Sequence, residues 1–141
     1  MASTPRFELV PLDRLRAHES VDPEEVRRLA QSLRTAGVVQ EPLLVADGSY
    51  VILNGHHRYH ALRALRAQRA PAWVVDYQDP GIALERWGPG PPIEKSEVVA
   101  HAERGEPFPV KTTRHLVRFE LPARPTPLAE LGVPSAVTGR A

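Results

Sequence analysis

The feature that most constrains the fold is an Asn-Gly turn between a β-type run and a basic helical pattern. The run ends at Leu53, the turn is Asn54-Gly55, and the helical pattern begins at His56. The first N–H groups of a helix have no partner within it, so such a junction directs free donors at one point and favours an anion there. The neighbouring Arg58 can bind two phosphate oxygens at once. We therefore predict a phosphate site, although a hairpin turn before a solvated surface helix has the same short pattern.

Length and composition predict a single cytoplasmic domain. The 141 residues support one modest core. Eighteen basic and seventeen acidic side chains leave a net charge of +1, so the overall field does not predict binding to duplex nucleic acid. The absence of cysteine excludes thiol catalysis, disulfides and cysteine-ligated zinc. Neither a leader pattern nor an apolar stretch of ~18 residues is present, so we expect no membrane partner.

The hydrophobic pattern predicts an α+β fold in which helices flank a small mixed sheet, because strands and helices alternate along the chain. We expect a domain over residues 1–121 and a proline-rich tail over residues 122–141, part of it disordered. The expected strands are residues 7–10, 42–45, 50–53, 72–77 and 116–119, and the expected helices are residues 23–36, 55–69 and 93–104.

A carboxylate and a basic cluster are further candidates for function. Glu19 follows His18 in a predicted loop and could orient or deprotonate a hydroxyl, although a solvated glutamate is the commonest kind. Residues 111–115, Lys-Thr-Thr-Arg-His, suit phosphates or a substrate carboxylate, although a solvated strand edge also carries such residues.

Histidines four residues apart offer a possible metal site. His56 and His60 have this spacing on the predicted helix, and His115 could join them. No glutamate follows His56 in the H-E-x-x-H manner, so the sequence favours an anion over zinc at this position.

Three separate parts of the sequence, within about residues 7–120, resemble a known superfamily. The string from Ile52 to Tyr59 is similar to the phosphate motif of the ParB/sulfiredoxin superfamily, in which a strand ends in G-x-x-R at a helix start. Within it, the chain resembles the archaeal free serine kinases and a siderophore-cluster serine kinase and regulator, which carry D-G-H-H-R. The string from Phe108 to His115 is similar to their F-P-x-K-T-T-R-H, and Glu19 falls where they keep a catalytic glutamate.

The resemblance implies a nucleotide-dependent kinase that converts free L-serine, or a similar amino acid, to O-phosphoserine with ATP or ADP and Mg²⁺. Glu19 would be the base or orienter of the serine hydroxyl, and Asn54 would be the second catalytic position, next to the metal. The residues implied to hold the phosphates are Gly55, His56, His57, Arg58, Lys111 and Thr112, and those implied to bind the substrate are Thr113, Arg114 and His115.

Two departures from the family pattern lead to an alternative function. Asn54 replaces the family's aspartate, so Mg²⁺ binding or proton acceptance there is weakened. The chain is also shorter than the archaeal kinases between Trp73 and Lys111. The alternative is a catalytically weak nucleotide-binding switch or regulator of the ParB-like type.

Two neighbouring branches of the superfamily fit less well. Sulfiredoxin chemistry needs the cysteine that this chain lacks. The chromosome-partition ParB proteins carry G-E-R-R and continue into a helix-turn-helix domain, whereas His56 and His57 occupy the middle of the motif here. The sequence therefore argues against direct sequence-specific DNA binding.

Overall fold

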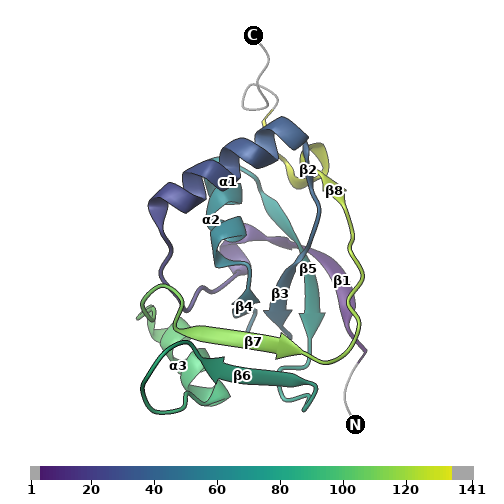
Figure 1. The fold of residues 1–141 in the computed structure, drawn as a ribbon. Coiled ribbons are helices and arrows are strands. Elements are labelled where there is room, and N and C mark those ends of the chain that lie inside the picture. Colours follow the sequence, from purple (N-terminus) through teal and green to yellow (C-terminus); the bar gives the residue numbers. More distant parts are fainter. Residues whose placement is uncertain (1–3, 135–141) are drawn as a thin grey trace.

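A four-stranded mixed sheet forms the centre of the computed structural model, which describes residues 4–134 (Figure 1). Its strands, in spatial order, are β1 (Arg6–Pro11), β5 (Arg69–Val75), β3 (Leu43–Ala46) and β4 (Ile52–Asn54). The β3–β5 pair is parallel and the other two pairs are antiparallel. The α+β class with a mixed sheet, predicted from the sequence, is confirmed.

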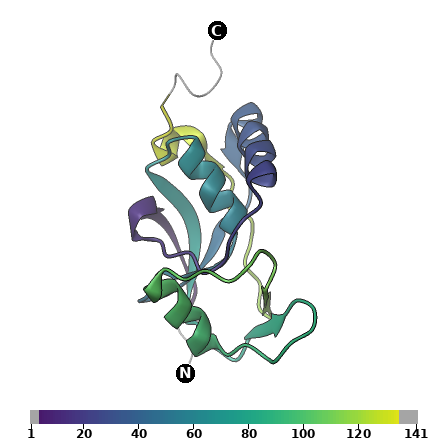
Figure 2. The same cartoon turned by 90° about the vertical axis from the view of Figure 1, so that its left-hand side faces the viewer.

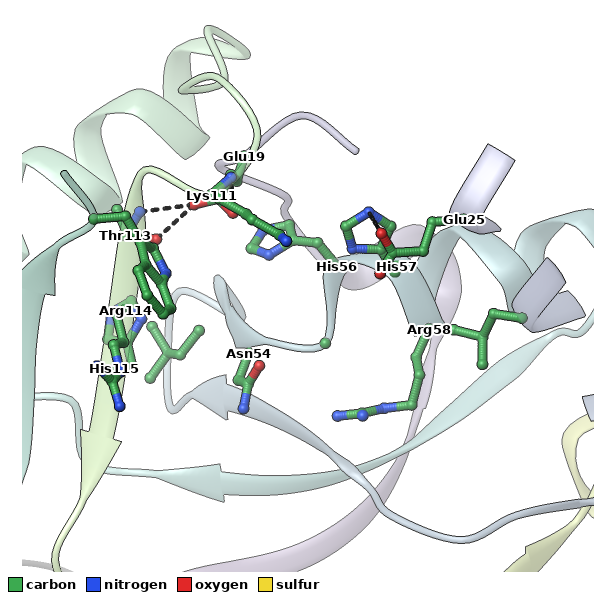
Figure 3. Close-up of a pocket in the computed structure, with 14 residues that line it drawn as sticks. Glu19, Glu25, Asn54, His56, His57, Arg58, Lys111, Thr113, Arg114 and His115 are labelled. Atoms are coloured by element: carbon green, nitrogen blue, oxygen red, sulfur yellow. Dashed lines mark hydrogen bonds and ion pairs between the residues drawn. The ribbon is translucent and has the colours of Figure 1, made fainter. Parts of the chain in front are cut away.

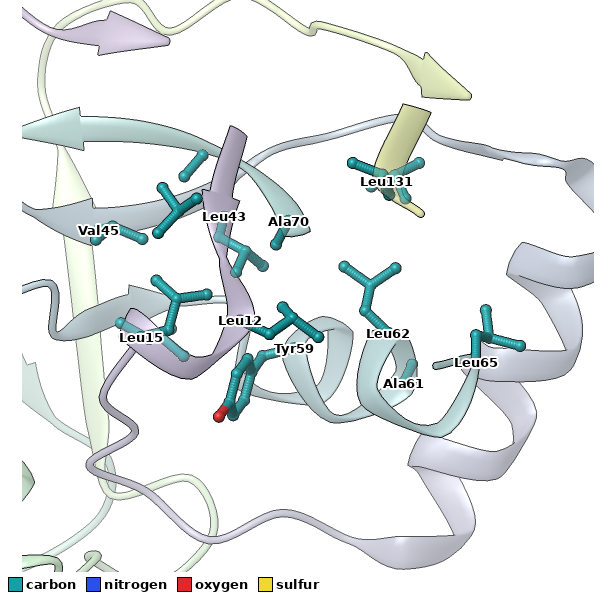
Figure 4. Packing of buried hydrophobic residues seen from close by; sticks show 14 of the residues in the cluster. Leu12, Leu15, Leu43, Val45, Tyr59, Ala61, Leu62, Leu65, Ala70 and Leu131 are labelled. Carbon is teal, nitrogen blue, oxygen red and sulfur yellow. The ribbon is translucent and has the colours of Figure 1, made fainter. Parts of the chain in front are cut away.

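Each face of the sheet has its own core, because successive side chains of a strand point to opposite faces. Leu43 and Val45 of β3 belong to the core that helices α1 (Pro23–Ala36) and α2 (His56–Ala64) cover (Figure 4). Leu44 and Ala46 face the other core, under the second layer of the molecule.

The second layer consists of α3 (Lys95–Arg104) and an antiparallel hairpin of β6 (Ile82–Arg86) and β7 (Thr113–Val117). Figure 2 shows this layer at the end of the molecule away from the C-terminus. Strand β6 was not predicted, because only Ile82 of it is fully buried and its remaining residues do not form an apolar stripe. Strand β7 begins three residues before the predicted 116–119 and therefore includes Thr113.

The first helix is the element that the sequence located best. Asp22 accepts a hydrogen bond from the Glu24 N–H, Pro23 occupies the first position, and Gly37 ends the helix with φ 75°. Helix α2 was predicted to reach residue 69 but ends at Ala64. The prediction was wrong there because residues from Arg69 onward pair with β1 instead.

Part of the predicted tail belongs to the core. Strand β8 (Thr126–Pro127) pairs with β2 (Val38–Val39), and the 3₁₀ helix η2 (Leu128–Leu131) follows. Leu128, Leu131 and Val133 are buried among the residues that α1 and α2 cover. Residues 135–141 of the predicted tail lie outside the described part.

A 3₁₀ helix, η1 (Leu12–Arg14), follows β1 and contributes Leu12 to the core. No helix within residues 4–134 is long and apolar enough to cross a membrane.

The burial of η2 can be tested with Leu131→Ala. Leu131 is fully buried, so the substitution removes apolar contacts and leaves a cavity. We expect the free energy of unfolding in urea to fall by about 2 to 5 kcal/mol. Glu130→Ala is the matched control, because this neighbouring side chain is exposed. Equal, small effects of both substitutions would contradict the packing of η2.

Candidate active site

Three distant segments of the sequence meet at a cavity of about 590 Å³ between the start of α2 and strand β7 (Figure 3). Ten of the eleven residues singled out in the sequence line it. They are Glu19, Asn54, Gly55, His56, His57, Arg58, Lys111, Thr113, Arg114 and His115. Thr112 does not line the cavity, because its side chain is buried and its hydroxyl donates to the Pro109 carbonyl at 2.6 Å.

Four lining residues were not singled out as site residues in the sequence. Glu25 and Leu29 come from α1, Leu53 comes from β4, and Trp87 directly follows β6. Trp87 opens the Gly- and Pro-rich connector, and its ring lies 4.9 Å from the Arg114 guanidinium carbon. An exposed tryptophan in such a connector is unusual, and this was the one feature of the sequence that could have indicated Trp87 as a site residue.

The start of α2 presents free backbone donors. Its first hydrogen bond runs from the Tyr59 N–H to the Gly55 carbonyl at 2.9 Å, and no side chain caps the helix. The N–H groups of His56, His57 and Arg58 are therefore available to an anion, as the sequence predicted.

Gly55 permits this geometry in two ways. Its backbone φ of 105° is one that residues with a side chain rarely adopt. A Cβ at this position would also lie 2.5 Å from Leu43 Cδ2 and 2.9 Å from Arg58 Nη2. Position 55 is therefore restricted to glycine by both backbone conformation and space.

The two histidines of the motif hold neighbouring segments through their rings. His56 Nε2 accepts a hydrogen bond from the His18 N–H, and His57 Nε2 accepts one from the Asp22 N–H, each at 3.1 Å. Burial lowers the pKa of His56 well below its usual value, so the ring is neutral and carries its proton on Nδ1. His56 can thus contribute donors to an anion but no positive charge.

Arg58 lies deeper than the sequence suggested. Its guanidinium donates to the Pro42 carbonyl at 3.3 Å, and burial lowers its pKa. Figure 3 shows this group below the backbone of His56 and His57. Arg58 therefore lines the floor of the cavity and supports the turn at Gly55.

Glu19 is tightly bound rather than solvated. Its backbone pairs with Phe108, and its carboxylate accepts four hydrogen bonds from residues 111–113. Oε2 accepts from the Lys111 N–H at 3.1 Å. Oε1 accepts from the Thr112 N–H at 3.3 Å, the Thr113 N–H at 2.9 Å and the Thr113 hydroxyl at 2.8 Å. Successive N–H groups directed at one point form an anion nest, and Glu19 fills it.

The basic cluster contributes its side chains to the cavity in different ways. Figure 3 shows the Lys111 ammonium extending into the cavity towards His56. Arg114 is half exposed, between Trp87 and Glu85. His115 Nε2 lies 2.7 Å from the Tyr77 hydroxyl, and burial lowers the pKa of His115 to about 3.

The described residues hold no ready-made metal centre. No group of three or more His, Cys, Asp or Glu side chains within residues 4–134 could bind a metal ion. Mg²⁺ needs fewer protein ligands, because it retains water and binds through one or two carboxylates plus substrate phosphates. Glu19 and Asn54 both line the cavity and carry suitable oxygens.

The requirement for glycine at position 55 gives a prediction. Gly55→Ala combines an unfavourable φ with a steric clash, so we expect the free energy of unfolding to fall by about 2 to 5 kcal/mol. Gly48→Ala is the matched control, because Gly48 also has a positive φ, 88°, but open space at Cβ. It should cost about 1 kcal/mol. Equal losses in urea unfolding would show that Leu43 and Arg58 do not restrict the position.

Three histidines with lowered pKa values predict acid sensitivity. Burial lowers the pKa values of His18, His56 and His115, so the unfolded chain binds more protons than the folded one below about pH 6.5. Stability should therefore fall from pH 6.5 to 4, by up to about 1.4 kcal/mol per pH unit for each histidine. Urea unfolding at pH 7, 6 and 5 should show that the free energy of unfolding falls less steeply with decreasing pH in His115→Gln than in wild type. An equal pH dependence in the two proteins would contradict the lowered pKa of His115.

Comparisons with curated proteins identify relatives named L-serine kinases. An ATP-dependent L-serine kinase of Staphylothermus marinus is 33% identical over 85 residues, which cover 57% of this chain and 34% of that protein. An ADP-dependent L-serine kinase of Thermococcus kodakarensis is 28% identical over 102 residues, which cover 70% of this chain and 42% of that protein. The chain thus matches about a third to two fifths of the length of these relatives.

Solved structures and a family model agree on the fold. A free serine kinase in complex with AMP has a TM-score of 0.78 at 20% identity, covering 90% of this chain and 93% of that one. C-terminally truncated SbnI from Staphylococcus aureus has a TM-score of 0.76 at 16% identity, covering 89% and 88%. The sequence model of the ParB N-terminal domain family matches residues 5–84, more than half of the sequence. The chain belongs to the ParB N-terminal domain family.

Proposed function

We propose that the chain is a nucleotide-dependent kinase that transfers a phosphoryl group from ATP or ADP to the hydroxyl of free L-serine. The observation that carries the proposal is the convergence of Glu19, the start of α2 and residues 111–115 on one cavity. Relatives that match more than half of this chain are named L-serine kinases, which supports the same conclusion.

The donor nucleotide would bind at the start of α2. The N–H groups of residues 56–58 can donate to phosphate oxygens, and the Lys111 ammonium extends towards them. Phosphoryl transfer needs positioning and positive charge more than covalent help from the protein. This region supplies both.

Glu19 would act on the serine hydroxyl through one of its two oxygens. Oε1 accepts three hydrogen bonds from the protein, whereas Oε2 accepts one. Oε2 therefore keeps a lone pair that can orient the hydroxyl and receive its proton. As the serine Oγ–P bond forms, the bridging O–P bond of the donor breaks, and ADP leaves from ATP or AMP leaves from ADP.

The serine carboxylate would bind at the β7 side of the cavity. Arg114 offers a planar fork of donors suited to a carboxylate. His115 is neutral, because burial lowers its pKa to about 3, so its contribution is limited to hydrogen bonding. Arg114 would therefore supply the charge that distinguishes an amino acid from a simple alcohol.

Mg²⁺ would be held mainly by the nucleotide phosphates. The Asn54 amide oxygen is the protein oxygen at the cavity that could face it, since Glu19 Oε2 is assigned to the serine hydroxyl. A bound Mg²⁺ offsets the negative charge that the phosphate oxygens carry during transfer.

A nucleotide-binding switch without turnover is the second candidate. Asn54 favours it, because an amide oxygen without charge stands where the resemblance expects an aspartate. A switch would bind ATP or ADP without consuming it. Steady phosphoryl transfer to any small acceptor would exclude this alternative.

The kinase proposal can be tested by ³¹P NMR with Mg²⁺, L-serine and ATP or ADP in turn. Wild type should produce O-phosphoserine. Glu19→Gln should lower kcat by about 100-fold or more, because an NH₂ group replaces an oxygen that accepts the proton. Nucleotide affinity should change less than about threefold, because the remaining oxygen can still accept bonds from the nest.

Glu25→Gln is the matched control, since it neutralises another carboxylate at the cavity wall. It should keep kcat within about threefold of wild type. Equal losses in both variants would remove the assigned role of Glu19. Nucleotide binding by wild type without phosphoserine formation would favour the switch.

A further inference from the structure

His18 is a fully buried residue that the proposed chemistry does not use. Its ring is 0% exposed and lies edge-on to those of His56 and His115, at centroid distances of 4.5 and 5.8 Å. Phe108 closes another side at 6.3 Å. The polar atoms of a histidine enclosed in this way are expected to form hydrogen bonds with other buried groups.

His18 begins a chain of hydrogen bonds that ends at the carboxylate of Glu19. His18 Nε2 lies 2.9 Å from the Thr113 hydroxyl oxygen, and this oxygen lies 2.8 Å from Glu19 Oε1. Thr113 is itself buried, with 8% of its surface exposed. His18 and Thr113 therefore interact away from bulk water, whereas Glu19 is partly exposed at the cavity.

Counting protons fixes the direction of this chain. An ionised carboxylate has no proton to donate, so the single hydroxyl proton of Thr113 is directed at Glu19. The hydroxyl oxygen must then accept from His18, so the imidazole proton is on Nε2. Burial lowers the pKa of His18, which keeps the ring neutral and restricts it to one proton.

The opposite tautomer would break the chain. His18 Nδ1 is buried and has no hydrogen-bond partner within residues 4–134. A backbone interaction with Ile52 raises the pKa of the ring, but the lowering by burial is the larger effect. A proton on Nδ1 would oblige the Thr113 hydroxyl to donate to His18 instead of Glu19. The position of one proton thus decides how Glu19 is held.

We propose that His18 is a positioning residue, which directs the Thr113 hydroxyl at Glu19 Oε1 and so leaves Oε2 as the oxygen that meets the acceptor hydroxyl. The inference rests on the proposed kinase function. Without this hydrogen bond the carboxylate could turn about its last torsion, which has a broad range in glutamate, and Oε2 would then be aimed away from the acceptor hydroxyl. The chain from His18 selects one orientation.

The first test uses steady-state kinetics of four single variants. His18→Met removes the donor at similar volume, whereas His18→Gln keeps an N–H donor near Nε2. Thr113→Val removes the hydroxyl at constant shape. Thr126→Val is the matched control, since Thr126 is also buried, at 4%, and its hydroxyl donates to the Arg124 carbonyl away from the cavity.

We expect kcat for phosphoserine formation to fall about tenfold or more in His18→Met and Thr113→Val, with the nucleotide Kd unchanged. His18→Gln and Thr126→Val should stay within about threefold of wild type. The double variant His18→Met/Thr113→Val should be no slower than Thr113→Val, because both changes break one chain. Additive losses, or a weaker nucleotide Kd in parallel with kcat, would indicate a merely structural role and overturn the proposal.

The second test does not depend on activity. Long-range ¹H–¹⁵N NMR of the ¹⁵N-labelled full chain reports which nitrogen of His18 carries the proton. We expect the Nε2–H tautomer in wild type, and a shifted His18 ring signal in Thr113→Val but not in Thr126→Val. An Nδ1–H tautomer would overturn the positioning role whatever the activity. The Nε2–H tautomer in a protein that makes no phosphoserine would instead count against the kinase function.

Discussion

The carboxylate of Glu19 in its backbone nest is the interaction on which the cavity depends. It joins the segment that follows η1 to the turn before β7, and these segments belong to different layers of the molecule. Lys111 adopts a φ of 58°, and this left-handed conformation helps to direct successive N–H groups at one anion. Without the carboxylate these donors would lack partners, so Glu19 shapes the wall of the cavity as well as facing into it.

The fold could be predicted where local signals were complete. Helix α1 begins and ends at the predicted residues because Asp22, Pro23 and Gly37 act through neighbouring backbone atoms. The end of α2 depends instead on pairing between β5 and β1, which no local pattern reports. Strand β8 and helix η2 were missed because prolines interrupt the apolar pattern of residues that are nonetheless buried, such as Leu128 and Leu131.

The site shows the same division between local and distant causes. The free donors at Gly55 follow from a short motif, and the structure contains them. The neutral state of His56, the deep position of Arg58 and the engagement of Thr112 by Glu19 follow from contacts between segments far apart in the sequence. A sequence identifies such residues as polar, but only their burial and partners determine which atoms remain available to a ligand.

The place of η2 in the core has a consequence for synthesis on the ribosome. Val39 pairs with Thr126, and Leu131 packs with Leu62 and Leu65, so the core beneath α1 and α2 needs residues from nearly the whole chain. The nascent polypeptide can form α1 and the β3–β4 hairpin early, but the part of the core that Leu128, Leu131 and Val133 complete stays open until this segment has emerged from the exit tunnel. Holdase chaperones would find their binding surface during that interval.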